Sequence, residues 1–214
     1  MKRVTYILFS FTIFLGGCGH HQAPFSMEKP TSNRPIVSLV PVIDHSKPLA
    51  RWNLSQELSQ TIRSRLAHEG TLYLLSKDLV DNLSEKIKPG KNPFSLDTQW
   101  IKKAYPPSEF IAFFELLNHK ISPLNHSESD LQPTSSFLNM SVRVRVFDVR
   151  GSSPQVVLEE LIEHSQYLPL QAENTSWGDD MFELSPVGLA HEKLCQELAT
   201  RVEDYILIRS VSNI

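Results

Sequence analysis

The chain has few of the residues that define the common catalytic and metal-binding motifs. Its 214 residues contain two cysteines, Cys18 and Cys195, and eight glycines. There is no CxxC pair, no HExxH segment, no GxSxG elbow and no glycine-rich phosphate-binding loop. The sequence therefore predicts no metal, no cofactor and no catalytic residue that a motif would identify.

A long hydrophobic run is also missing. The uncharged, mostly apolar stretch Tyr6–Leu15 is shorter than the roughly 20 residues that a transmembrane helix needs. Lys2 and Arg3 precede this stretch, and together they fit the positive start and apolar core of an export signal. A mitochondrial presequence would instead be rich in arginine and amphipathic.

The residues that follow the apolar stretch, Leu15-Gly16-Gly17-Cys18, resemble the lipobox of bacterial lipoproteins. The resemblance implies cleavage between Gly17 and Cys18 and a covalent diacylglycerol on the Cys18 thiol. An N-acyl chain would bring the anchor to three chains, more than the two signals that stable anchoring requires. Gly19 stands where aspartate favours retention in the inner membrane, so the resemblance implies the outer membrane, facing the periplasm. An ordinary secretory signal with an incidental cysteine is the alternative.

Cleavage at this point would divide the chain into a leader (1–17), a lipidated tether (18–34) and one globular domain (35–214). The mature chain would keep 19 basic and 24 acidic residues, a net charge of −5, which argues against nucleic acid as a partner. The tether is polar and without period, and its reach is about 50 Å at most. His20 and His21 in the tether are only a weak indication of metal binding.

Cys195 would have no disulfide partner if Cys18 carries lipid. It lies between Leu194 and Leu198 in a helical pattern. A small buried apolar residue is the usual role of cysteine in such a place, and a reactive thiol is the alternative. The fold must then be stabilised by its core without a disulfide.

The apolar periodicity predicts a fold of the α/β (α+β) class, in the order β-α-β-α-(α)-β-β-β-α, with one mixed sheet and helices packed against it. The predicted strands are 36–43, 72–75, 109–117, 138–148 and 156–167, and the predicted helices are 54–69, 77–87 and 96–104. A last helix is predicted to start at Ser185-Pro186 and to carry its apolar stripe as far as Ile206. The segment 156–167 also fits a helix. Segments 122–136 and 168–184 are predicted to be a long polar loop and an irregular stretch.

Capping residues support the predicted helices. Asn53 is placed to cap the first helix and Gly70 to end it, while Ser185-Pro186 fits the start of the last helix. Pro41 marks an edge, a bulge or the end of the first strand. Acidic residues of the last strand are expected to face two arginines of the strand before it: Glu159, Glu160 and Glu163 opposite Arg143 and Arg145.

The first part of the domain resembles a periplasmic module shared by the curli secretion channel CsgG, the penicillin-binding-protein activator LpoB and the N-terminal domain of TolB. The resemblance rests on a strand ending at Pro41, the helix LSQELSQTIRSRL, Gly70, and a strand ending at Ser76-Lys77-Asp78-Leu79. It extends over residues 35–208 by element order and implies a membrane-tethered docking domain. The short tether argues against the activator mechanism, and the lack of spare hairpins argues against a pore.

Two polar groups have the residue types of a chemical site. Asp44-His45-Ser46 has those of a hydrolytic triad, but neighbours along a chain cannot converge as a triad must, so a polar turn is expected. Gly178-Asp179-Asp180 with Glu183 could hold calcium through oxygen ligands. It lacks the spacing of a dedicated site, and a solvated acidic loop is expected there.

The sequence thus favours a non-enzymatic docking or assembly module of the cell envelope, with an envelope protein or a second copy as partner and no small-molecule substrate. The segments 122–136 and 168–184 are candidate contact surfaces, and so are three tryptophans, which could instead belong to the core: Trp52, Trp100 and Trp177. One alternative is an envelope hydrolase whose site assembles only in three dimensions, with one of three histidines in a deep pocket beside carboxylates: His45, His119 or His164. Another is a purely structural or antigenic surface lipoprotein.

Overall fold

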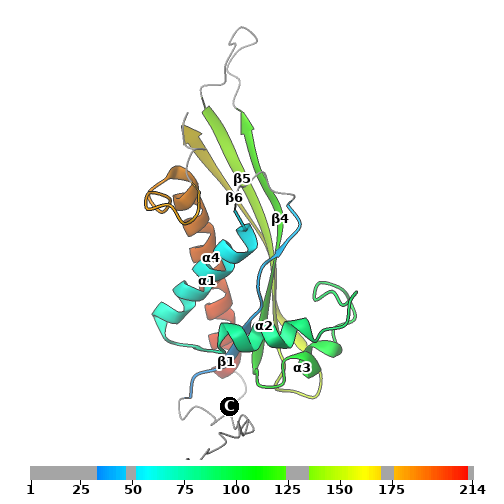
Figure 1. The fold of residues 1–214 in the computed structure, drawn as a ribbon. Helices are drawn as coiled ribbons and strands as arrows, with labels where there is room; N and C mark the ends of the chain where they lie inside the picture. The colour runs from blue at the N-terminus through cyan, green and yellow to red at the C-terminus, as the bar shows by residue number, and fades with distance from the viewer. Residues whose placement is uncertain (1–32, 47–51, 124–134, 170–175, 212–214) are drawn as a thin grey trace, which may run out of the picture. The chain divides into compact units, whose positions relative to one another are not determined.

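The computed structural model describes residues 33–46, 52–123, 135–169 and 176–211. In this part of the chain six strands form one mixed sheet, and four helices pack against it (Figure 1). The predicted fold class is therefore confirmed. The elements are β1 (Ile36–Leu39), β2 (Ile43–Asp44), α1 (Leu54–Glu69), β3 (Tyr73–Leu74), α2 (Lys77–Glu85), α3 (Trp100–Ala104), β4 (Phe110–Pro123), β5 (Ser135–Asp148), β6 (Gln155–Pro169) and α4 (Pro186–Val211). The predicted leader and almost all of the tether lie outside the described residues.

The sheet has the order β3-β1-β4-β5-β6, and β2 also pairs with β4. β1 is parallel to β3 and β4, whereas β4, β5 and β6 form an antiparallel meander of long strands. Pro41 lies between β1 and β2, where its missing N–H interrupts the ladder. It therefore marks the end of β1, one of the three positions that the sequence allowed.

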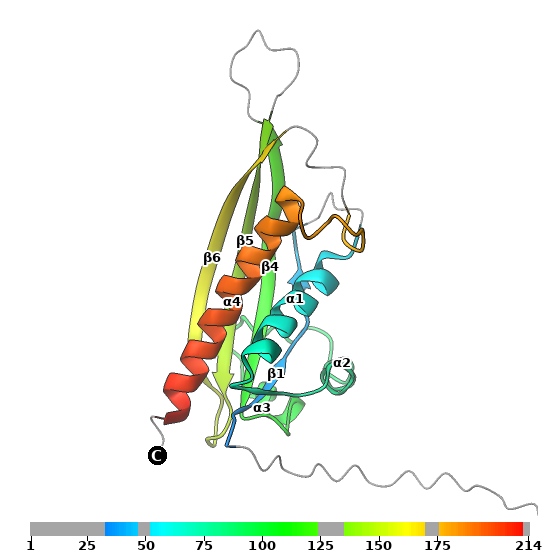
Figure 2. The same cartoon turned by 90° about the vertical axis from the view of Figure 1, so that its left-hand side faces the viewer.

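Helices cover both faces of the sheet. α1 and α4 lie side by side on one face (Figure 2), where they share a core with β4, β5 and β6. α2 and α3 pack on the other face near the start of β4, around Ile111 and Phe113. All buried core residues belong to the compact unit Arg34–Ile214. Among the described helices, none has both the length and the hydropathy of a membrane-crossing segment.

The two long helices begin where their sequences predict, and α1 also ends there, at Gly70, whereas α4 continues beyond Ile206 to Val211. The Asn53 side chain accepts a hydrogen bond from the Gln56 N–H at 3.0 Å, and Gly70 ends α1 with a φ of 68°. The Ser185 hydroxyl accepts one from the Gly188 N–H at 3.0 Å. The predicted apolar stripes of both helices are buried: Leu54, Leu58, Ile62 and Leu66 in α1, and Ala190, Leu194, Leu198, Val202 and Ile206 in α4.

Some predicted boundaries are wrong. α3 begins at residue 100 and not 96, because the Ser95 hydroxyl donates to the Asn92 carbonyl and caps no helix. α2 ends at residue 85 and not 87. The ambiguous segment 156–167 is strand, within β6.

The two predicted polar segments, 122–136 and 168–184, have different boundaries in the structure. The ends of 122–136 belong to β4 and β5, while 124–134 lies outside the described residues. The start of 168–184 belongs to β6, 170–175 lies outside the described residues, and residues 177–184 form turns.

The expected cross-strand pairing is only partly correct. Arg145 forms an ion pair with Glu159 at 2.9 Å. Arg143 lies opposite Leu161 in the register, so its guanidinium turns the other way and binds Glu115 on β4, at 2.9 Å from Nε. Glu160 faces α4, where it accepts a hydrogen bond from the Tyr205 hydroxyl at 3.3 Å. Glu163 lies opposite Ser141 and not opposite an arginine.

Candidate functional site

A buried polar network connects α1, α4 and β4 inside the larger core. His191 of α4 contacts Glu57 of α1 at 2.6 Å through Nδ1 and His119 of β4 at 3.0 Å through Nε2. The other carboxylate oxygen of Glu57 accepts a hydrogen bond from the Trp52 indole at 2.6 Å. Glu57, His119 and His191 are all buried, so their hydrogen-bonding groups depend on one another for partners.

Burial keeps His119, one member of this network, uncharged at neutral pH. Desolvation, together with the neighbouring His191, lowers the pKa of His119 from 6.5 to about 4. At neutral pH His119 is therefore uncharged, and its Nε2 can donate to Nε2 of His191. That arrangement leaves Nδ1–H of His191 to donate to Glu57.

The geometry of the network limits its chemistry. A general base needs a ring nitrogen within hydrogen-bonding reach of a substrate, but both nitrogens of His191 already contact protein atoms. The nearby Cys195 is fully buried, and desolvation raises the pKa of its thiol well above the usual range. This confirms the expected role of Cys195 as a small buried residue. The network has the features of a structural bridge between three elements.

An open pocket of about 600 Å³ lies beside the network, between α1 and the start of α4. Glu57 and His191 form part of its wall, together with Trp177, Phe182 and the ion pair of Arg65 with Glu192. Phe182 also contacts Trp52 edge to face, with ring centroids 5.4 Å apart. The pocket therefore reaches polar groups that are already hydrogen-bonded within the chain.

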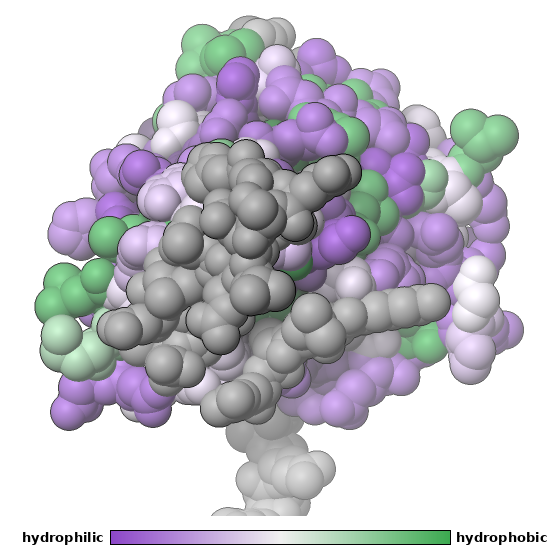
Figure 3. Space-filling view, turned by 90° about the horizontal axis from the view of Figure 1, so that it is seen from above, coloured by the Kyte–Doolittle hydropathy of each residue, from purple (hydrophilic) through white to green (hydrophobic). Residues whose placement is uncertain are grey.

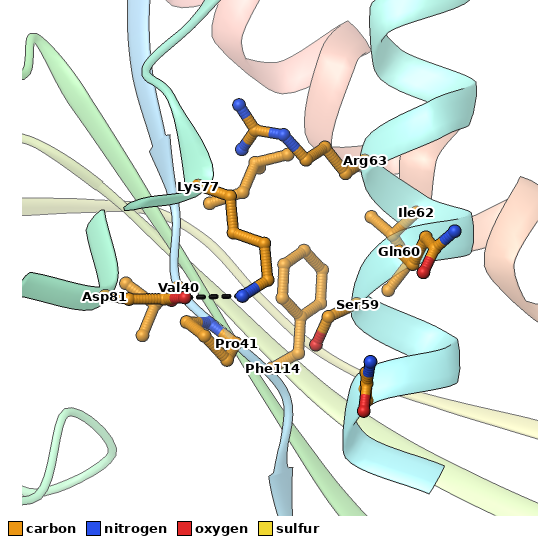
Figure 4. A pocket seen from close by; sticks show the side chains of 11 residues that line it. Val40, Pro41, Ser59, Gln60, Ile62, Arg63, Lys77, Asp81 and Phe114 are labelled. Carbon is orange, nitrogen blue, oxygen red and sulfur yellow. Dashed lines mark hydrogen bonds and ion pairs between the residues drawn. The ribbon is translucent and has the colours of Figure 1, made fainter. Parts of the chain in front are cut away.

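A smaller pocket of about 130 Å³ lies between α1, α2 and the end of β1 (Figure 4). Its walls are mostly apolar, and Pro41 and Phe114 are among them. Both cations at its rim are engaged: Arg63 donates to the Leu75 carbonyl, and Lys77 pairs with Asp81. A cavity of this size accommodates one small apolar group.

The three tryptophans differ in their surroundings. Trp52 packs on the larger core and donates to Glu57. Trp177 packs on the same core and lines the larger pocket. Trp100 packs on the smaller core beside Phe113, and its indole donates to the Asp97 carbonyl at 2.9 Å. All three are partly buried, which agrees with the alternative role in the core.

The three histidines named for a hydrolase have different surroundings, and none of them lines the pocket beside the network. His45 is more than half exposed and lies 3.2 Å from Glu115, while His119 belongs to the buried network. His164 lies on β6, where burial and Lys193 lower its pKa. The expected polar turn is confirmed, because Asp44 accepts hydrogen bonds from both the backbone and the hydroxyl of Ser46.

The acidic stretch considered for calcium, Gly178-Asp179-Asp180 with Glu183, lies in a turn. The Asp179 carboxylate accepts a hydrogen bond from the Ser176 N–H at 2.8 Å, and Gly178 has a φ of 98°. Asp180 and Glu183 are exposed. Within the described ranges no three histidine, cysteine or carboxylate side chains are placed to share a metal ion.

Sequence reasoning missed Glu57 and His191 as members of the network. Glu57 follows Leu54 by three positions and precedes Leu58, so it lies on the apolar stripe of α1. His191 stands three positions before Leu194 in the same way. A charged or titratable residue on a buried stripe indicates a buried partner, and this signal could have identified both.

These features define a single-sheet α+β protein with a buried histidine–carboxylate bridge. The chain belongs to the family of unknown function DUF7499, whose model matches residues 25–210. No curated protein has a matching sequence.

Solved structures with a similar fold include the hypothetical protein CT253 from Chlamydia trachomatis. It is 28% identical, with a TM-score of 0.60, over 81% of this chain and 98% of that chain. Lipoprotein GNA1162 from Neisseria meningitidis is 11% identical, with a TM-score of 0.43, over 81% and 98%. The C-terminal domain of LpoB from Salmonella enterica is 11% identical, with a TM-score of 0.39, over 60% and 81%.

The matches thus include a lipoprotein by name, and none of the three names states an enzymatic activity. At the two lower TM-scores the likeness supports no conclusion about this chain. The resemblance to the CsgG, LpoB and TolB module therefore stays a prediction.

Proposed function

We propose that this chain is a membrane-anchored lipoprotein of the bacterial envelope whose domain docks onto another envelope protein and has no catalytic activity. The lipobox residues Leu15 to Cys18 support the anchor. The observation that carries the docking role is the exposed margin of β6, defined by Leu161 and Tyr167.

The β6 margin combines an open strand edge with exposed apolar side chains. β6 is 15 residues long and ends the sheet, so its outer edge has no strand partner in the described part of the chain. Leu161 and Tyr167 point away from α4 and are 54% and 48% exposed. An edge of this kind can accept a strand from a partner, with side-chain pockets adding specificity.

The polar network supports a non-enzymatic role. His191 has both ring nitrogens occupied, and Cys195 is a buried thiol whose pKa is raised. Of the histidines that a hydrolase would need, His119 and His164 lie on either side of Met140 on β4 and β6, and His45 lies beside Glu115. We therefore favour docking over hydrolysis.

Site-specific photo-cross-linking in intact cells tests the docking role. A benzophenone amino acid placed at Tyr167 or Leu161 of the full chain should give a reproducible cross-linked band. The same probe at Leu189, an apolar residue of α4 that is also 48% exposed, is the matched control and should give none. A band at twice the mass of the chain would identify a second copy as the partner. No band from either β6 position would contradict the proposal.

The anchor has a separate test at Cys18. Cys18→Ala should leave an unprocessed precursor of higher mass and should abolish incorporation of labelled palmitate, because the thiol that accepts the lipid is gone. Cys195→Ala, which changes the only other cysteine, should be processed normally. Normal processing of the Cys18 variant would refute the lipoprotein assignment.

A further inference from the structure

Positive charge is concentrated in one segment of a chain that is otherwise acidic. Residues 86–103, which we call the basic segment, contain five lysines and one aspartate, a net charge of +4. It forms an open pocket of about 310 Å³ between α2 and α3, lined by Lys86, Lys88, Lys91 and Lys103 around Ile87 and Trp100. Apolar and aromatic side chains are thus surrounded by ammonium groups.

Most of this charge is not neutralised within the domain. Lys91 pairs with Asp97 at 2.7 Å, and Lys102 donates to the Gly151 carbonyl. The other three lysines have no ion-pair partner among the described residues: Lys86, Lys88 and Lys103. Three cations are therefore free to attract an anionic surface.

The basic segment also exposes a large apolar side chain. Leu96 is 99% exposed, and it directly precedes Asp97, whose carbonyl accepts a hydrogen bond from the Trp100 indole. An exposed leucine, a tryptophan at the rim and surrounding lysines are the combination found where proteins lie on a membrane surface. A free leucine side chain has no structural role inside this domain.

The basic segment lies toward the end of the sheet at which the chain enters the domain. β1 begins and α4 ends at this end, and α3 also lies toward it, in both views (Figures 1 and 2). The Glu109 N–H donates to the Ile36 carbonyl at 2.9 Å, which ties the segment after α3 to the first strand. Arg34, where the predicted tether ends, is therefore at the same end as α3.

Two acidic side chains at this end are engaged within the chain. Asp148 is bound by Arg150 at 2.9 Å and by Arg209 at 3.3 Å, so the group is cationic as a whole. The side chain of Glu109 accepts a hydrogen bond from the Ile36 N–H. The described surface at the opposite end is mainly hydrophilic, with separate apolar patches (Figure 3).

We infer that the basic segment is a second, non-covalent membrane contact that binds the anionic headgroups of phospholipids. The inference rests on the proposed lipid anchor, which holds this end of the domain within the roughly 50 Å reach of the tether. The net charge of the whole chain does not oppose the contact, because interactions beyond about 8 Å are screened at physiological salt. The contact orients the domain on its membrane.

Vesicle co-sedimentation tests the contact without the lipid anchor. The probe is the mature chain, residues 18–214, with Cys18→Ser, which keeps every core residue. It should bind vesicles of phosphatidylglycerol and phosphatidylethanolamine, bind phosphatidylcholine vesicles far more weakly, and lose affinity as salt is raised. Leu96→Ser should weaken binding to the anionic vesicles without changing the fold.

The lysine variants give the sharpest comparison. The double variant Lys88→Gln, Lys103→Gln should lower the affinity for anionic vesicles about 30-fold, because each lysine near the surface contributes about fivefold. Lys120→Gln with Lys193→Gln removes the same charge from β4 and α4 and should change affinity less than about twofold. Circular dichroism should show the same fold for both double variants.

Several results would overturn the inference. Equal binding to anionic and phosphatidylcholine vesicles would refute the proposed site. An equal loss of affinity in the two double variants would also refute it. Competition by inorganic phosphate at constant ionic strength would indicate a site for free phosphate. A protein captured by a cross-linker at residue 96, with no vesicle binding, would indicate an acidic partner instead. Because the assay uses unlipidated protein, its failure leaves the tests at Cys18 and Tyr167 unaffected.

Discussion

Glu57→Ala is expected to lower the free energy of unfolding by about 2–6 kcal/mol, because it leaves two donors unsatisfied at about 1–3 kcal/mol each. Glu57 accepts hydrogen bonds of 2.6 Å from Trp52 and contacts His191 at 2.6 Å, and its own side chain is 2% exposed. Alanine would leave the indole N–H of Trp52 and the buried ring of His191 without their protein acceptor. The loss therefore includes the desolvation cost of both groups.

Urea unfolding followed by circular dichroism measures this loss. Glu57→Gln keeps one acceptor oxygen and should retain part of the stability. Glu69→Ala, at the exposed last turn of the same helix, is the matched control and should change it by less than about 0.5 kcal/mol. A loss below about 1 kcal/mol for Glu57→Ala would show that the network does not bridge α1 and α4.

Stability is also expected to fall as the pH is lowered from about 6.5 to about 4, by up to about 3 kcal/mol from His119 alone. The folded protein lowers the pKa of His119 from 6.5 to about 4. Between these values the unfolded chain binds a proton that the folded chain does not, so acidification favours unfolding. Above pH 6.5 both states are neutral, and this contribution is complete.

The slope of unfolding free energy against pH, compared between the wild type and histidine variants, separates the contribution of His119 from that of the carboxylates. His119→Gln should reduce this slope between pH 6.5 and 4, whatever its effect on stability at neutral pH. His68→Gln, an exposed position of α1, should leave the slope as it is in the wild type. An unchanged slope in the His119 variant would mean that this histidine is protonated in the folded state.

Both predictions concern residues that join distant parts of the chain. Glu57 and His191 are 134 positions apart, and His119 and His191 are 72 apart. The network thus connects α1 and α4 to β4, while β6 is held by its pairing with β5. A rigid sheet with a defined open edge is what a docking domain requires.

Local patterns were sufficient for most of the fold. The leucines of α1 and the stripe of α4 repeat every four residues and fall on the buried faces. Asn53, Gly70 and Ser185 act as caps because capping depends on the few residues around a helix end. The period of two in β5 likewise fixes which side chains face α4, whatever the rest of the chain does.

Local patterns were insufficient where two alternatives have the same period or where the structure depends on distant partners. The segment that became β6 also fits a helix, and its pairing with β5 along its whole length decides for a strand. Arg143 binds Glu115 and not a residue of β6, because the register places it opposite Leu161. A register is a property of two strands, and neither strand contains it alone.

The sequence by itself thus determined the caps, the buried stripes and the alternating strands, since each depends on residues within one or two turns. It also contains the whole argument for the lipid on Cys18, which is a local motif. Only the tertiary structure decided that His119, His191 and Glu57 meet, and that the basic segment lies near the entry of the chain. These depend on contacts between residues far apart in the chain, and the entropy of closing such loops is compensated only when the whole core forms.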